Sequence, residues 1–144
     1  MEIKKTGVVL FSLLLGLCIW SGTTHAKEKP VVIAAMVYGT HNEVSFDGFK
    51  LGLKDKGYVE GENVSYLFDG PYKKVADLAA AMEKLVVQKP DLIFAATTPV
   101  TMAAMKATVG NKIPVIFGPV NDPVKSGIVK TQKRPGGHIT GVML

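Results

Sequence analysis

Short apolar runs alternate with helix-like patterns after residue 30, and this alternation limits the possible folds more than any other feature. The runs with the length and composition of buried strands are 31–38, 63–68, 92–96, 114–117 and 139–142. Between them, apolar residues recur every three or four positions, as in amphipathic helices. This pattern predicts an α/β fold, an open parallel sheet with helices on both faces. We expect the strand order 2-1-3-4, with the fifth strand at the edge and right-handed crossovers.

The helix expected over residues 73–89 has the most regular pattern. Its apolar residues recur at intervals of three and four, its charged residues fall between them, and Pro90 ends it. The apolar stripe expected to face the sheet consists of Val75, Leu78, Ala79, Met82, Leu85 and Val86.

Capping signals mark the helix that follows the first strand. Thr40 and Glu43 have the spacing of a capping box, in which each side chain binds a free amide of the first turn. Gly57 can adopt the left-handed conformation that ends a helix. These residues predict a helix that starts near Thr40 and ends at Gly57.

Two later positions combine a capping side chain with a proline. Thr98 precedes Pro99, and Asp122 precedes Pro123. Proline suits the first helical position because the amide proton that it lacks would have no helical partner, while threonine and aspartate are good N-caps. We therefore expect one helix after Thr98 and another after Asp122.

The first 26 residues have the three parts of a secretory signal peptide. Two lysines give a positive start, an apolar run covers 7–20, and the small residues Thr24 and Ala26 precede a cleavage site. The run is shorter than the roughly 20 residues of a membrane-spanning helix, although an uncleaved anchor stays an alternative. We assign 1–26 to a signal peptide and 27–144 to one exported domain, periplasmic or otherwise extracytoplasmic.

Cys18 is the only cysteine, and it lies within the signal segment. The mature domain is therefore expected to have no disulfide and no thiol chemistry. A lipid anchor at Cys18 is disfavoured because Leu17, directly before it, is larger than the small residue that lipoprotein signals place there.

Removal of the signal lowers the formal net charge from +5 to +4, because Glu2, Lys4 and Lys5 leave with it. The remaining basic residues are scattered and form no dense tract. We interpret them as solvated helix faces and expect no nucleic-acid partner.

A candidate ligand site follows from the predicted sheet. Ligands of open parallel sheets bind beyond the carboxyl ends of the strands, and three loops there lead directly into expected helix starts. Free amides and the positive end of the helix dipole attract a small anion such as a carboxylate. The candidate ligand-binding residues are Tyr38, Gly39, Thr40, Thr97, Thr98, Asn121 and Asp122. For the threonines and Asp122, simple helix capping explains the residue type equally well.

The sequence contains no pattern that indicates catalysis. It has neither a G-x-G-x-x-G segment after the first strand nor a phosphate-binding lysine loop. The mature histidines, His41 and His138, have no carboxylate at metal-ligand spacing. We expect a protein that is not an enzyme, with no cofactor and no metal.

Several short motifs, in a fixed order, resemble those of a known family. They are GL at 52–53, GYVEGENV at 57–64, KPDLI at 89–93, IPVIF at 113–117, DPV at 122–124 and RPGGHITGV at 134–142. These segments resemble the ABC transporter substrate-binding proteins of the tryptophan/tyrosine-type family, which have the type I periplasmic-binding-protein fold. His138 departs from the resemblance, because that family usually has asparagine there, and this puts only the local turn in doubt.

The resemblance implies an extracytoplasmic component of an ABC import system. Such a protein binds a small solute, such as an amino acid, between two lobes and delivers it to ABC permease subunits in the membrane. The resemblance covers 31–142, so we expect the N-terminal lobe only, with the second lobe absent. Two alternatives stay open: a ligand-sensing domain that is not coupled to transport, and an inactive truncated gene product. Neighbouring permease and ATPase genes would favour transport.

The signal-peptide assignment predicts that the exported protein begins at Lys27. The peptidase accepts the small residues Thr24 and Ala26 before the cut. N-terminal sequencing of the exported protein checks this, and a terminus at a lipid-modified Cys18 would contradict it.

Overall fold

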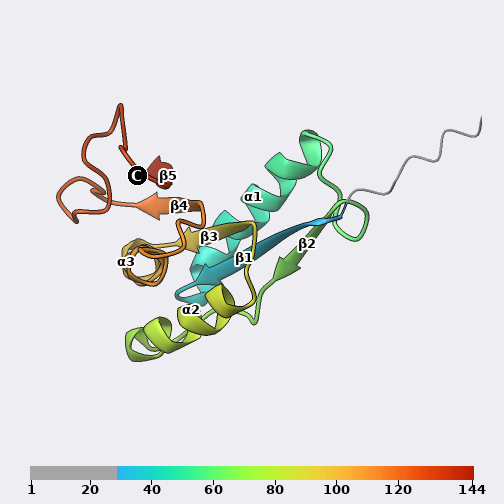
Figure 1. The fold of residues 1–144 in the computed structure, drawn as a ribbon, viewed down its shortest axis with the longest axis horizontal. Coiled ribbons are helices and arrows are strands. Elements are labelled where there is room, and N and C mark those ends of the chain that lie inside the picture. Colours follow the sequence, from blue (N-terminus) through green and yellow to red (C-terminus); the bar gives the residue numbers. More distant parts are fainter. Residues whose placement is uncertain (1–28) are drawn as a thin grey trace, which may run out of the picture.

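Five parallel strands form the centre of the computed structural model, which describes residues 29–144 (Figure 1). The predicted signal segment lies outside the described residues. Each of the five expected strands is present. The elements in chain order are β1 (Val31–Val37), η1 (Thr40–Asn42), α1 (Glu43–Asp55), β2 (Val64–Leu67), η2 (Val75–Asp77), α2 (Leu78–Val87), β3 (Leu92–Ala96), α3 (Thr98–Ala107), β4 (Val115–Val120) and β5 (Ile139–Met143).

The strand order is β2-β1-β3-β4-β5, as the sequence predicts. β1 pairs in parallel with β2 from Val31 opposite Val64, and with β3 as far as Val37 opposite Ala96. The central strands are buried almost throughout, which fits their nearly continuous apolar sequences.

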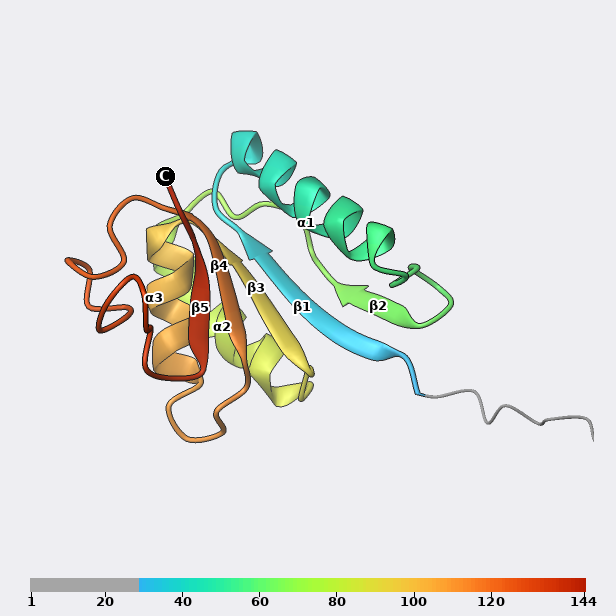
Figure 2. The same ribbon diagram turned by 90° about the horizontal axis from the view of Figure 1, so that it is seen from above.

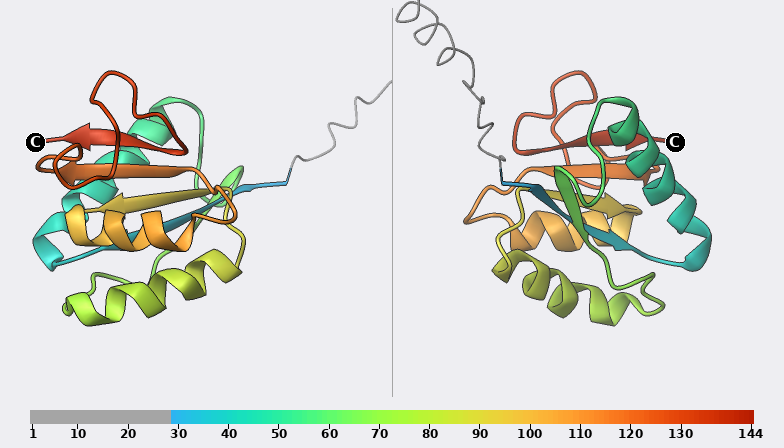
Figure 3. Two further views of the ribbon diagram at one scale, coloured as in Figure 1. Left: turned by 60° about the vertical axis from the view of Figure 1, so that its left-hand side comes forward. Right: turned by 90° about the vertical axis from the view of Figure 1, so that its right-hand side faces the viewer.

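Helices cover both faces of the sheet, with α1 on one face and α2 and α3 on the other (Figures 2 and 3). The side chains of each strand alternate between the two faces. Ala34 and Met36 of β1 belong to the core that includes α2 and α3, whereas Ala35 and Val37 pack with Phe46 of α1. None of the helices within residues 29–144 is long and apolar enough to span a membrane.

The capping box expected at the start of α1 does not form. Thr40 lies in the 3-10 turn η1, so Glu43 is the first residue of α1 and not the third, and the N-cap is Asn42 without a side-chain capping bond. The predicted end is correct. Gly57 has φ +88°, its amide binds the Lys54 carbonyl, and the next amide, of Tyr58, binds the Leu53 carbonyl, which is the Schellman arrangement.

The start of α3 differs from the prediction by one residue. Thr98 is the first helical residue and Pro99 the second, so the N-cap position belongs to Thr97. Thr97 has φ +87° and makes no side-chain capping bond.

No helix follows Asp122. The Asp122 carboxylate accepts the Lys125 amide at 2.9 Å and so caps a single turn. Gly127 then takes φ +70°, and the chain turns inward so that Ile128 and Val129 are buried in the core. The segment after Asp122 thus contributes two buried side chains to the core as an irregular loop, where the sequence predicted a helix.

Gly141 of β5 lies directly against β4. A Cβ atom added at Gly141 would overlap the Phe117 backbone oxygen and lie 2.6 Å from the Phe117 ring. The β4–β5 ladder, in which Gly141 is opposite Phe117, therefore has no room for any larger residue here.

The helix predicted over 73–89 is confirmed as α2, preceded by η2. Leu78, Met82 and Leu85 of the predicted stripe are buried, with exposed fractions of 2%, 0% and 5%. Val75 and Ala79 are exposed, so the stripe is narrower than predicted. Val75 lies in the 3-10 turn, where the helical period does not apply.

Truncation of the stripe should destabilise the fold. Leu78→Ala or Leu85→Ala is expected to lower the free energy of unfolding by about 2–5 kcal/mol, because each leaves a cavity in the core. Val87→Ala, at a residue 77% exposed on the same helix, serves as the control and should cost less than about 0.5 kcal/mol. Urea denaturation measures all three, and losses below about 0.5 kcal/mol for Leu78→Ala and Leu85→Ala would mean that the stripe faces water.

Candidate functional site

The loop after β1 is held in a defined shape by backbone and amide bonds. Gly39 has φ +78°, a conformation that glycine adopts without strain, and its amide binds the Tyr72 carbonyl at 2.9 Å. The Asn42 side chain donates to the Tyr38 carbonyl at 2.7 Å. The loop therefore keeps a half-buried Tyr38 and an exposed Thr40 at the carboxyl end of β1.

Thr97 is the most unusual residue at this edge of the sheet. Its φ of +87° is uncommon for a residue with a branched side chain. Its Oγ1 atom is buried and has no hydrogen-bond partner among the described residues. Its carbonyl accepts both the amide and the hydroxyl of Thr101, at 3.0 and 2.8 Å. The bonds of Thr101 thus help to hold the strained residue at the start of α3.

Asn121 and Asp122 follow β4 at the same edge, and both are exposed. The Asp122 carboxylate accepts the Lys125 amide, and the Asp122 carbonyl accepts the Ser126 amide at 3.0 Å. Asp122 therefore caps its own turn, which leaves Asn121 as the freer polar group on this loop.

The strand register shows which predicted residues come together. Because Val37 is opposite Ala96, Tyr38 and Thr97 are the next residues of two neighbouring strands, and Gly39 and Thr98 follow them. Asn121 leaves β4 beyond the last β3–β4 pair, Ala95 with Phe117, so it extends further along the strand direction than Thr97 does.

Sequence reasoning missed Tyr72 at this edge. Tyr72 pairs with Tyr38 in a single parallel bridge, and its amide binds the Val37 carbonyl at 2.8 Å. Burial raises the pKa of the Tyr72 hydroxyl, and the carboxylates of Asp69 and Asp77 raise it further, so the hydroxyl stays a neutral donor. Tyr72 lies in the loop after β2, and the rule that such loops gather at one edge would have identified it.

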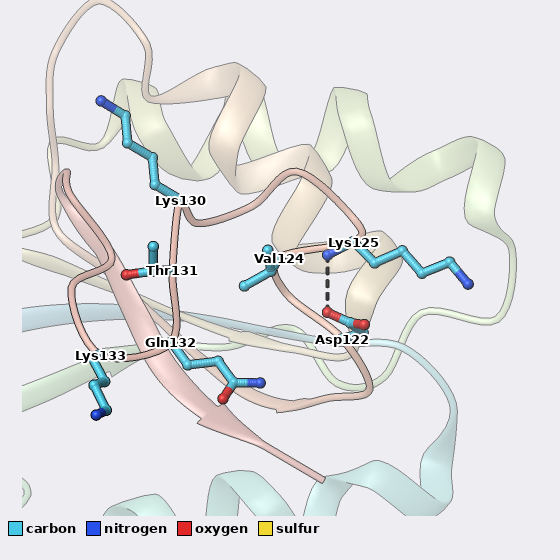
Figure 4. A pocket seen from close by; sticks show the side chains of 7 residues that line it. All are labelled: Asp122, Val124, Lys125, Lys130, Thr131, Gln132 and Lys133. Carbon is cyan, nitrogen blue, oxygen red and sulfur yellow. Dashed lines mark hydrogen bonds between the residues drawn. The ribbon is translucent and has the colours of Figure 1, made fainter.

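A wide hollow of about 670 Å³ lies elsewhere, on the segment between β4 and β5 (Figure 4). Of the predicted site residues it includes only Asp122. Its other lining residues are Val124, Lys125, Lys130, Thr131, Gln132 and Lys133. We place the candidate solute site at the strand ends because, within residues 29–144, helix amides and a buried unpartnered hydroxyl coincide there. Within residues 29–144, no group of three histidine, aspartate or glutamate side chains could hold a metal ion.

The edge formed by Tyr38, Gly39, Thr97 and Thr98 offers hydrogen-bond donors and an aromatic ring. The first amides of an α-helix have no partner within the helix. At α3 these are the amides of Thr98 and Val100, since Pro99 has no N–H and the Thr101 amide binds the Thr97 carbonyl, and the Thr97 hydroxyl is a further donor at the same helix start. Such an arrangement suits a small anionic group such as a carboxylate.

Known proteins of the same type match this chain. A family model described as "ABC transporter substrate binding protein" matches residues 30–143. The tyrosine-binding protein of Clostridioides difficile (strain R20291) is 35% identical over 119 residues, which are 83% of this chain and 34% of that protein. The chain thus spans about a third of the length of this relative.

Solved structures agree with the sequence match. A substrate-binding protein with adhesive properties from Clostridium difficile, in its ligand-free, open form, has a TM-score of 0.68 at 33% identity over 78% of this chain and 38% of its own. An ABC domain from Streptococcus pneumonia in complex with L-Trp has a TM-score of 0.69 at 27% identity over 80% of this chain and 38% of its own. The motifs, the sheet and these matches lead to one assignment: the chain belongs to the ABC transporter substrate-binding protein family.

Proposed function

We propose that this chain is the N-terminal lobe of an extracytoplasmic solute-binding component of an ABC import system. It binds a small solute between its own lobe and a second lobe, and it delivers the solute to ABC permease subunits in the membrane. It performs no catalysis. The family and the signal-like first 26 residues support this proposal.

The observation that carries the proposal is Thr97. A buried hydroxyl without a partner costs free energy, and a positive φ at a threonine costs more. A ligand group that accepts a hydrogen bond from Thr97 Oγ1 would offset the free energy of the unpaired hydroxyl and would account for the strained backbone. A solute carboxylate fits best, because the adjoining amides of α3 also favour negative charge.

The solute that we propose is an amino acid, with an aromatic one as the first candidate. One relative is a tyrosine-binding protein, and another was solved in complex with L-Trp. In this chain, Tyr38 offers a half-buried ring next to Thr97. Aromatic rings attract one another edge to face or offset by about 0.5–1.5 kcal/mol beyond burial. Thr98 and Asn121 would complete the polar contacts from the neighbouring loops.

Binding should depend on Thr97. In the protein with both lobes, Thr97→Val is expected to weaken amino-acid binding about 10- to 150-fold, the loss of one hydrogen bond to a charged carboxylate. Thr98→Val should do the same, while Thr140→Val, at an exposed threonine of β5, should change nothing. Isothermal titration well below the melting temperature measures the three affinities. If all variants bind as tightly as the parent, the threonines do not contact the solute.

Thr97→Gly separates a ligand-binding role from a structural one. Glycine adopts a positive φ without strain and leaves no buried hydroxyl, so the melting temperature of the ligand-free protein should rise or stay unchanged. Affinity for the amino acid should fall, as in Thr97→Val. Loss of stability together with unchanged affinity would mean that Thr97 serves the fold alone.

A further inference from the structure

The whole net positive charge of residues 29–144 comes from one segment. Outside residues 123–138, the described chain contains ten lysines and ten acidic residues and is formally neutral. Within 123–138 there is no acidic residue, and the four basic ones are Lys125, Lys130, Lys133 and Arg134. These side chains were expected on helix faces, but the segment loops out beside β4 and β5 (Figures 1 and 2).

The four basic side chains are exposed, and none of them forms an ion pair within residues 29–144. The segment that presents them is nonetheless held firmly. The Pro123 carbonyl accepts the amides of Ile128 and Val129 at 2.9 and 3.1 Å, and both of these side chains are buried. Thr131 Oγ1 accepts the Arg134 amide at 3.0 Å and donates to its carbonyl at 2.9 Å. A surface with net charge +4 is thereby preformed.

The composition of this surface distinguishes between classes of partner. Protein interfaces are depleted of lysine and depend on tryptophan, tyrosine and arginine, but 123–138 has three lysines, one arginine and no aromatic residue. Its wide hollow is bordered by Lys125, Lys130 and Lys133, with Val124 39% exposed beside them (Figure 4). Lysines around an exposed aliphatic side chain suit anionic phospholipid headgroups.

We propose that residues 123–138 form a docking surface for an anionic phospholipid membrane, through Lys125, Lys130, Lys133 and Arg134. Each basic side chain near such a surface adds to the attraction, and salt weakens it because the charges are exposed. The inference goes beyond solute binding and does not depend on it. Docking at this segment would keep a solute-binding lobe at the membrane face.

Flotation with lipid vesicles tests the proposal on the whole protein without solute. Vesicles of phosphatidylcholine with about one third phosphatidylglycerol should bind the protein, vesicles of pure phosphatidylcholine should not, and about 0.5 M NaCl should release it. The fourfold variant K125Q/K130Q/K133Q/R134Q should lose binding by at least about tenfold.

A matched control removes the same charge from elsewhere. K54Q/K56Q/K73Q/K84Q also neutralises four exposed lysines and should keep binding within about twofold of the parent. If the first variant does not fold, K125Q/K133Q decides. Neither side chain makes a hydrogen bond within residues 29–144, and binding of this double variant should fall at least about threefold. Equal losses in both fourfold variants would overturn the proposal in favour of net charge alone. If the parent protein does not bind the phosphatidylglycerol vesicles, the proposal is overturned as well, and an acidic protein surface becomes the better candidate partner. Neither result bears on amino-acid binding, so failure here is distinguishable from failure of the proposed function.

Discussion

The parallel ladder between β1 and β3 determines where the other elements of the fold lie. It runs from Ile33 opposite Leu92 to Val37 opposite Ala96, so both strands end at the same level. The next residues, Tyr38 and Thr97, must therefore leave the sheet side by side. A shift of one residue would exchange the two faces of a strand and would bring Ala34 and Met36 out of the core that they share with α2 and α3. Burial on both faces thus fixes the position of the candidate site.

Most of this architecture could be predicted from the sequence, because it depends on long-range burial that leaves a clear periodic pattern. The apolar runs gave the strands, and the stripe of Leu78, Met82 and Leu85 gave α2. The failures involve local signals with more than one outcome. Thr40 enters a 3-10 turn in place of a capping box, and Asp122 caps a turn that stops at Gly127. A cap signal specifies a turn, but tertiary packing decides whether a helix follows.

The candidate site was foreseen less completely than the fold. The rule about strand ends pointed to the correct edge, yet no sequence pattern marks a threonine with φ +87°. That conformation depends on how β3 passes into α3 and on the two bonds that Thr101 makes to the Thr97 carbonyl. Tyr72 was missed although the same rule about strand ends applies to the loop after β2. It comes close to Tyr38 only because the chain returns from β2 along the end of β1.

Electrostatics divides the described chain into two regions. Over most of the described chain, basic and acidic residues balance, and what would attract an anion at the candidate site is nearby dipoles such as the amides of α3. These act over a few ångströms and are sensitive to shape. The segment 123–138 carries full charges in water, which act over about 10 Å and vary with salt. The first kind of interaction depends on the shape of the bound group, whereas the second depends on the salt concentration.

The contact of Gly141 with Phe117 bears on how proteins of this type are recognised. The segment RPGGHITGV made the resemblance easy to see, but its last glycine is required because β4 leaves no space for a Cβ atom. Any chain that builds this sheet with the same strand contact needs glycine at this point, whatever it transports. A signature of this kind identifies the scaffold, and two proteins that share it need have no solute in common.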